Sequence, residues 1–493
     1  MRKIIDPQMT FGQTPIDQIK FDMRARDEIP KVLLGLQHIY CQKQLRQEVF
    51  DILKTMIPEK VDSKNGRPGM ELWKILVMGT IRLNCNWDYD KLQEIVNNHK
   101  TIRQMLGHGL MDNDVTYPLQ TLKDNVQLLT VEILDKINTL VIKEGHKVLM
   151  QKKSPDAETL MGRCDSFVVE TDVHYPTDIN LLFDAARKMI QVAAVISQTL
   201  GMSLWRQSEY NIRSFKRLYR KAQRLNYSTS KDETKKAQKA QQIINAHKTY
   251  IDSAEGFIRK ATLTIEMAGS HDVVVMAGTE ALKTYISYAV WQINLIQRRV
   301  IQGEKIPHQD KIFSIFEPHT EWISKGKAGV SQELGLRVCI LEDQYGFILH
   351  HQVMEKQTDD KVTVAMIESA QNKFSNLSGC SFDKGFYSPG NKKELRSRLD
   401  ILVLPKKGKC NKAEHEEETA EIFIQSKRRH SAVESAINGL ENHGLDRCPD
   451  HGIKGFKRYV SLSVLARNLQ IIGHHIQQKE LKRIQRFEQR KAA

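Results

Sequence analysis

Three acidic residues stand far apart in this sequence, each in a setting that suits a metal ligand. Asp165 lies within an apolar run, Asp383 lies where a short apolar run meets a turn, and Glu434 lies on a basic amphipathic segment. Mg²⁺ prefers oxygen ligands and keeps positions for water and phosphate oxygens, so a fold that gathers these carboxylates can hold two ions for phosphodiester chemistry. We therefore expect two Mg²⁺ or Mn²⁺ ions as the cofactor.

The first acid has an alternative seven residues further on, Asp172. Side chains alternate along a strand, so an odd separation points Asp165 and Asp172 to opposite faces. Only one of the two can face the site if the strand is regular. Asp178 follows Pro176 and is better interpreted as a turn or helix-cap residue.

The other two acids also have simpler interpretations. Asp383 is followed by a glycine two residues later and could form an ordinary turn. Glu434 could be a surface residue that offsets the charges of Arg428 and Arg429. We favour metal ligands, because Glu434 borders an apolar stripe and stands near cations able to hold phosphates. In that interpretation Arg429 and His430 contact a DNA phosphate or the leaving group.

The elements that must position these acids are predicted from hydrophobic periodicity. Residues 163–173 have the character of a strand, and a helical pattern follows from residue 181 to about residue 299. Without that helical block, the order is strand, hairpin of two strands, helix, strand, helix, strand and helix. This order resembles the ribonuclease H-like fold, whose first and fourth strands place side chains beside each other. The expected later elements are strands 334–341 and 347–353, helix 360–374, a strand into Asp383, helix 392–398, strand 401–404 and helices from about 427.

The N-terminal part is predicted to be helical. A helix over 31–57, a second one that starts near Pro68, and a longer one from Pro118 towards Lys147 are expected. Short helices with tight connections fit either a helix-turn-helix reader of DNA or a plain helical bundle. The polar stretch 151–156 is the best candidate for a linker.

Charge favours a polyanionic partner. The chain has 493 residues, a formal net charge of +15 and a pI near 9.3. In the helical block, Arg213, Arg217 and Arg220 alternate with apolar residues, which fits either a solvated face or a helix that offers cations to a DNA backbone. Seven scattered cysteines indicate reduced thiols, and no stretch reaches bilayer-spanning length. We expect a cytoplasmic, nucleoid-associated protein with no membrane partner and, without a Gly-x-x-x-x-Gly-Lys loop, no nucleotide cofactor.

Four ordered segments resemble bacterial insertion-sequence transposases of the DDE class. They are Asp165 to Asp178, Glu321 to Lys327, Asp383 to Tyr387 and Arg428 to Glu434, and the start Gly66-Arg67-Pro68 also resembles the N-terminal domain of those proteins. The resemblance implies a metal-binding triad of Asp165, Asp383 and Glu434. The family habit of a Ser or Thr directly after the first Asp favours Asp165 over Asp172. The expected DNA contacts are Arg428, Arg429, His430, Lys325, Lys327, Arg213, Arg217 and Arg220.

The resemblance further implies an enzyme that cleaves the ends of a mobile DNA element and joins them to target DNA. Paired double-stranded ends imply a homodimer on DNA. The expected class is a multidomain α+β protein with a ribonuclease H-like core. A catalytically silent DNA-binding derivative and a stand-alone nuclease of the same fold are the alternatives. The expected parts are a helical N-terminal DNA-binding domain (1–155), the core (156–180 and 306–480), a helical insertion (181–305) and a basic C-terminal tail (481–493).

Two features depart from common patterns in that family. Many relatives have a Lys or Arg two helical turns after the catalytic Glu, whereas this chain has Glu441 there. A cation must therefore come from elsewhere, with Lys454, Lys457 and Arg458 as candidates. The large helical block also follows the first strand instead of preceding the Glu-bearing helix.

Overall fold

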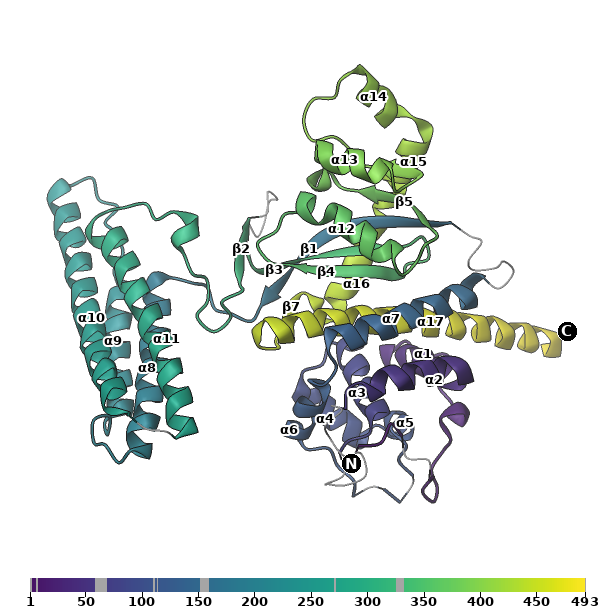
Figure 1. Ribbon diagram of the computed structural model, residues 1–493, viewed down its shortest axis with the longest axis horizontal. Coiled ribbons are helices and arrows are strands. Elements are labelled where there is room, and N and C mark those ends of the chain that lie inside the picture. The colour runs from purple at the N-terminus through teal and green to yellow at the C-terminus, as the bar shows by residue number, and fades with distance from the viewer. Residues whose placement is uncertain are drawn as a thin grey trace. The chain divides into compact units, whose positions relative to one another are not determined.

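The computed structural model describes residues 2–5, 8–57, 69–109, 111–112, 114–150, 159–269, 272–324 and 332–492. The chain divides into two compact units. The first combines Met1–Asp172 with Glu321–Ala493, and the second is Val173–Thr320. The first unit is α+β and contains a mixed sheet, and the second is helical (Figure 1).

The sheet is built around β1, which contains Asp165. On one side, β1 pairs with β3 in antiparallel fashion, and β3 pairs with β4 and β2; on the other side, β1 pairs in parallel with β5, and β5 with β6. A short strand, β7, pairs in parallel with the end of β1. The strand bounds are β1 (Leu160–Thr171), β2 (Glu321–Ser324), β3 (Gln332–Glu342), β4 (Ile348–Met354), β5 (Leu377–Phe382), β6 (Ile401–Val403) and β7 (Arg447–Cys448).

Helices from the second half of the chain cover this sheet. In chain order they are α12 (Asp359–Gln371), α13 (Pro389–Arg396), α15 (Glu421–His430) and α16 (Ala432–Leu440). α12 packs against β3 and β4, α13 against β6, α15 against β5 and β6, and α16 against β1, while α14 (Lys412–Thr419) packs against α15. The strands and helices predicted between residues 334 and 404 are confirmed, with end points that differ by a few residues.

The N-terminal helices share one hydrophobic core with the sheet. The long C-terminal helix α17 (Gly452–Ala492) joins them, because it packs against α1, α3 and α7 as well as β4. Figure 1 shows α7 and α17 lying along each other between the sheet and the other N-terminal helices. These helices are α1 (Glu28–Cys41), α2 (Lys43–Lys54), α3 (Leu72–Asn84), α4 (Tyr89–Asn98), α5 (Lys100–Met105), α6 (Leu119–Val126) and α7 (Val131–Met150).

Two predicted N-terminal helices are each divided in the structure. The helix expected over 31–57 is interrupted at Gln42, whose backbone is extended (φ −78°, ψ 101°) between α1 and α2. The helix expected from Pro118 towards Lys147 is also wrong as one element: α6 ends at Val126 and α7 begins at Val131. The hydroxyl of Thr130 accepts a hydrogen bond from the Ile133 N–H, which supplies a new helix start. The apolar periodicity continues across both breaks, so periodicity alone did not reveal them.

Side-chain amides cap the first residue of the outer strand β4. The Oδ1 of Asn468 on α17 accepts a hydrogen bond from the Ile348 N–H at 3.0 Å, and its Nδ2 donates to the Ile348 carbonyl at 3.1 Å. Asn138 on α7 also donates to that carbonyl, at 3.4 Å. An uncovered strand edge invites pairing with other chains, so these amides protect the sheet and hold α7 and α17 against it.

The second unit is a bundle of long helices that lie side by side (Figure 1). Side-chain oxygens of Thr177, Asp232 and Asp272 cap three of them. Inside, Phe215 stacks on Tyr250 with ring centroids 4.5 Å apart. The helices are α8 (Asp178–Thr199), α9 (Ser208–Arg224), α10 (Glu233–Met267) and α11 (Val273–Ile296), so this unit extends beyond the interval 181–305 at both ends.

In the part of the chain that the structure describes, no helix combines the length and apolar character needed to cross a bilayer.

Candidate active site

Asp165 lies in the middle of β1, opposite Ile340 of β3. Its side chain is half-buried, and its Oδ1 accepts a hydrogen bond from the Ser166 N–H at 2.7 Å. Because side chains alternate along a strand, Asp165 shares a face with Arg163, and Ser166 points to the other face.

Asp383 comes directly after β5, and the strand register places it beside Asp165. The parallel pairs of β1 and β5 include Arg163 with Ser381 and Cys164 with Phe382, so the next step along both strands is Asp165 with Asp383. A 3₁₀ turn, Lys384–Phe386, follows and is anchored by the buried ring of Phe386. The Asp383 side chain is exposed. Asp383 therefore begins a turn, as its simpler interpretation expects, and is also placed next to the first acid.

Glu434 lies in the first turn of α16, which packs against β1. The preceding helix α15 is fixed at its end by His430, whose Nδ1 is 3.0 Å from the Ser381 hydroxyl oxygen. Arg163 also donates a hydrogen bond to the Arg429 carbonyl at 3.5 Å. Since Arg163 and Ser381 are register partners, both contacts join the end of α15 to the face of the sheet that carries Asp165.

The other acids of this region affect the electrostatics of Asp165. Its pKa is raised to about 6, first by burial and then by repulsion from Asp383, Asp359 and Glu434, against the opposing effect of the Ser166 N–H. Burial lowers the pKa of His430, and the negative charges of Asp383 and Glu434 partly oppose that shift. The structure thus places Asp383 and Glu434 within electrostatic range of Asp165.

A fourth carboxylate, Asp359, lies near Asp165 but on the other face of β1, to which Ser166 points, and it was missed from the sequence. It is the first residue of α12, and its Oδ1 accepts a hydrogen bond from the Ser166 hydroxyl at 2.7 Å. Gly385 approaches it closely, because a Cβ at Gly385 would lie only 2.9 Å from the Asp359 Oδ2. From the sequence alone, Asp359 would be interpreted only as an acidic residue at the start of a helix. The serine directly after Asp165 was the one available signal, but its partner depends on the fold.

Replacing Asp359 tests this proximity. In the protein without divalent ions, we expect Asp359→Asn to lower the pKa of Asp165, because a repelling charge is removed. The measurement is a ¹³C NMR titration of aspartate-labelled protein, with the Asp165 signal assigned from Asp165→Asn. Asp360→Asn is the matched control, because Asp360 bonds to Thr358 and is not among the acids that raise the pKa of Asp165. An unchanged Asp165 titration in Asp359→Asn would contradict the arrangement.

Asp165, Asp383 and Glu434 have the chemistry of a Mg²⁺ site, since carboxylate oxygens are its preferred protein ligands. As positioned, however, no three His, Cys, Asp or Glu side chains among the described residues form a group able to hold an ion. Like charges repel, and after burial this repulsion adds to the rise in the pKa of Asp165. A divalent cation would relieve it, so the donor set fits the ion and its side chains must draw closer to bind it.

The raised pKa also predicts how stability depends on pH. An ordinary Asp titrates near pH 3.9, so between about pH 4 and pH 6 the unfolded chain loses a proton that folded Asp165 keeps, and stability falls as pH rises. Without divalent ions, Asp165→Asn should therefore raise the free energy of unfolding by roughly 1–2 kcal/mol near pH 7.5, and by almost nothing near pH 4. Thermal denaturation at both pH values measures this difference. An equal gain at both would show that the effect is not titration of Asp165.

The alternative first acid, Asp172, lies apart from this group. It is exposed beyond the end of β1, and its Oδ1 is 3.7 Å from Nη1 of Arg447, which also pairs with Glu170. Asp172 is not among the acids that raise the pKa of Asp165. Asp178 is the first residue of α8 and pairs with Arg299 at 3.0 Å, while Thr177 provides the cap.

The expected DNA-contacting cations fall into three groups. Arg428 and Arg429 have exposed side chains on the last turn of α15. Arg213, Arg217 and Arg220 are exposed on α9, in the helical unit. Lys325 and Lys327 lie outside the described residues, as do Gly66-Arg67-Pro68 and the proposed linker 151–156.

Two of the cations considered as replacements for the one missing at Glu441 already have acidic partners. Lys457 pairs with Glu355 at 2.6 Å, and Arg458 pairs with Asp450 at 3.5 Å.

No protein-family model, no curated protein and no solved structure matches this chain.

Proposed function

We propose that this protein is a DNA transposase of the DDE class, in which Asp165, Asp383 and Glu434 bind the divalent ions. One observation carries the proposal: β5 leads into Asp383 in register with Asp165 of β1, and Glu434 lies on α16, which packs against β1, although both are hundreds of residues from Asp165 in sequence. Acids on the central strand of a sheet and on the elements beside it, two of them exposed, suit a site that must admit a polymer.

The sheet topology supports a ribonuclease H-like core. β1, β3 and β4 form an antiparallel group, while β5 and β6 continue the sheet in parallel with β1. The acids come from β1, from the end of β5 and from α16. This is the arrangement that the resemblance to DDE transposases implies.

The proposed reaction exchanges phosphodiester bonds. Water first cleaves a strand at the element end and leaves a 3′ hydroxyl, and that hydroxyl then attacks a target phosphodiester and displaces another 3′ oxygen. One phosphodiester replaces another, so the joining step needs no nucleotide. Bound Mg²⁺ or Mn²⁺ would supply Lewis acidity and make a bound water more acidic.

The remaining residues have positioning roles in this proposal. Arg428 and Arg429 would hold DNA phosphates beside the acids. His430, fixed by Ser381 near Asp383 and Glu434, would contact a phosphate or the leaving group. The exposed arginines of α9 would bind the DNA backbone, and two copies of the chain would hold two element ends.

The test uses the full-length protein and double-stranded DNA carrying the inverted repeats that flank its coding sequence. With Mg²⁺ or Mn²⁺ we expect strand cleavage at the repeat ends and joined products with target DNA, and neither with a chelator. Cleavage without joining would instead support a stand-alone nuclease. Binding without cleavage would support a catalytically silent derivative.

A further inference from the structure

The C-terminal part of α17 presents a row of cations that the proposed chemistry does not use. Position 479, the adjacent pair 482 and 483, and positions 486 and 490 follow one another at helical spacing, so they lie on one side of the helix. All five side chains are exposed. We call this set the cationic stripe: Lys479, Lys482, Arg483, Arg486 and Arg490.

Most of these charges are not neutralised within the protein. Arg483 is 3.5 Å from Glu480, but among the described residues Lys479, Lys482, Arg486 and Arg490 have no acidic group within 4 Å. The other acid of the segment, Glu488, pairs with Arg24 at 2.8 Å. Four exposed cations on about three helical turns therefore face solvent with their charge uncompensated.

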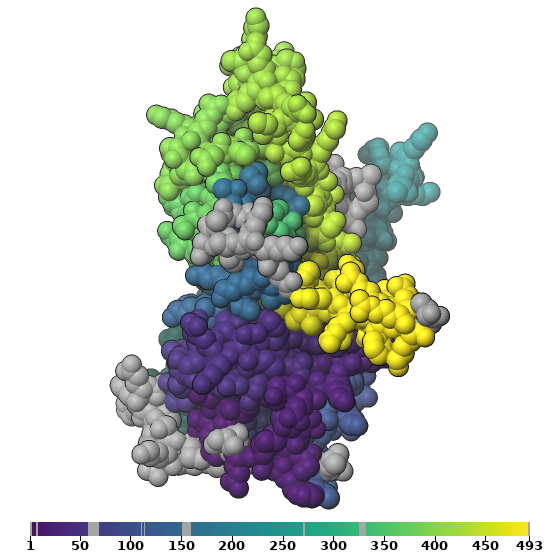
Figure 2. Space-filling view, turned by 90° about the vertical axis from the view of Figure 1, so that its right-hand side faces the viewer, coloured from purple at the N-terminus to yellow at the C-terminus, as the bar shows by residue number. Residues whose placement is uncertain are grey.

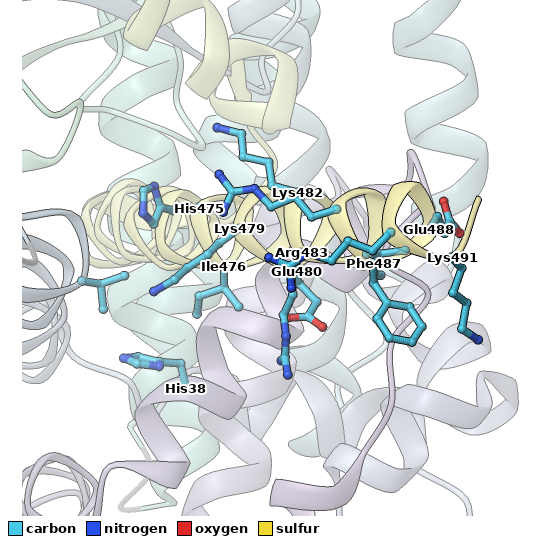
Figure 3. Close-up of a pocket in the computed structure, with 14 residues that line it drawn as sticks. His38, His475, Ile476, Lys479, Glu480, Lys482, Arg483, Phe487, Glu488 and Lys491 are labelled. Atoms are coloured by element: carbon cyan, nitrogen blue, oxygen red, sulfur yellow. The ribbon is translucent and has the colours of Figure 1, made fainter. Parts of the chain in front are cut away.

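The stripe borders a groove of about 1230 Å³ whose other wall includes His38 of α1 and Val148 of α7. Figure 3 shows His38 facing Ile476 and Lys479 across this groove. In Figure 2 this part of α17, drawn in yellow, lies at the surface. The charge of the stripe affects a neighbouring group. Burial is the main cause of the lowered pKa of His475, and the charges of Lys479 and Lys482 lower it further.

We infer that the cationic stripe binds the sugar–phosphate backbone of duplex DNA. Cations on one side of a helix beside an open groove complement a polyanion that carries a negative charge about every 1.7 Å along its axis. An anionic membrane fits less well, because a membrane-binding helix needs an exposed apolar face. Here the apolar side of α17 packs on the protein core as far as Ile476, and of the large apolar residues in the stripe segment only Phe487 is strongly exposed.

This inference rests on the proposed function only for the choice of DNA as the polyanion. The contact is independent of sequence, because it involves phosphates alone. It would hold DNA on a surface formed by α17, α1 and α7, elements that the proposed catalytic site does not include.

The experiment measures binding of a fluorescent duplex of about 30 base pairs to the full-length protein at several salt concentrations. The test variant is Lys482→Glu/Arg486→Glu/Arg490→Glu, and the matched control keeps the charges: Lys482→Arg/Arg486→Lys/Arg490→Lys. Each phosphate contact contributes about 0.9 to the slope of log K against log salt, so reversal should reduce that slope by roughly 2 to 3 and weaken binding at least about tenfold. The control should bind like the wild type.

Unchanged affinity and slope in the charge-reversal variant would overturn the inference. So would an equal loss in the charge-retaining control, which would indicate damaged packing. Stronger binding to vesicles of phosphatidylserine and phosphatidylcholine than to DNA would assign the stripe to a membrane. If the stripe variant loses DNA binding while the wild type never cleaves DNA, the inference stands and the proposed function fails.

Discussion

Asp383→Asn and Glu434→Gln should each reduce metal-dependent DNA nicking by at least about a thousandfold, equivalent to about 4 kcal/mol in the activation barrier. Each change keeps the shape of the side chain and removes the negative charge that a divalent ion requires. Both side chains are exposed at the edge of the fold, so stability should change little. Nicking of element-end DNA with Mg²⁺ gives the rate, and binding of the same DNA should remain within a few-fold of the wild type.

The matched pair for this prediction is Asp165→Asn and Asp172→Asn. Asp165 interacts with Asp383 and Glu434, whereas Asp172 pairs with Arg447 beyond the end of β1. We therefore expect Asp165→Asn to lose activity and Asp172→Asn to keep it. Nicking activity that survives in Asp383→Asn or Glu434→Gln would contradict the proposed triad. Loss only in Asp172→Asn would show that the first acid is misassigned.

The elements around the three acids could be predicted because their signals are local. Strand alternation, the turn between β3 and β4, and the apolar stripe of α12 are each contained in a short window of sequence. The same reliance on local patterns explains why two divided helices were each predicted as one continuous helix. Gln42 and the segment after Gln127 interrupt helices within a continuous apolar pattern, and that pattern reports burial of one face, not backbone continuity.

The position of Asp359 near Asp165 could not be predicted from local sequence patterns. Its place beside Asp165 depends on α12 starting over β1, on the Ser166 hydroxyl pointing to that helix, and on the close approach of Gly385. None of these contacts is local in sequence. By contrast, strand alternation alone left the choice between Asp165 and Asp172 open. The positions of β5 and α16 beside β1 favour Asp165.

The same long-range packing predicts a large effect on stability at Gly473. This residue lies on α17 where it crosses α1, and a Cβ there would overlap the carbonyl oxygen of Lys31. Gly35 on α1 has the reciprocal position, because a Cβ there would overlap the carbonyl oxygen of Leu469. The two helices thus approach closely enough that backbone touches backbone, and no side-chain rotation can relieve an added methyl group.

Gly473→Ala should therefore lower the free energy of unfolding by about 3 kcal/mol or more, at the upper end of the cost of overpacking a core. The loss should spread through the first unit, because α17 joins α1, α3 and α7 to β4. Gly455→Ala is the matched control on the same helix, since its Cβ would meet its nearest neighbour at 3.5 Å, an ordinary contact. That change should be neutral or slightly stabilising, because alanine favours helix more than glycine does. Urea unfolding followed by circular dichroism measures both variants, and equal stability of the two would mean that α1 and α17 do not meet through these glycines.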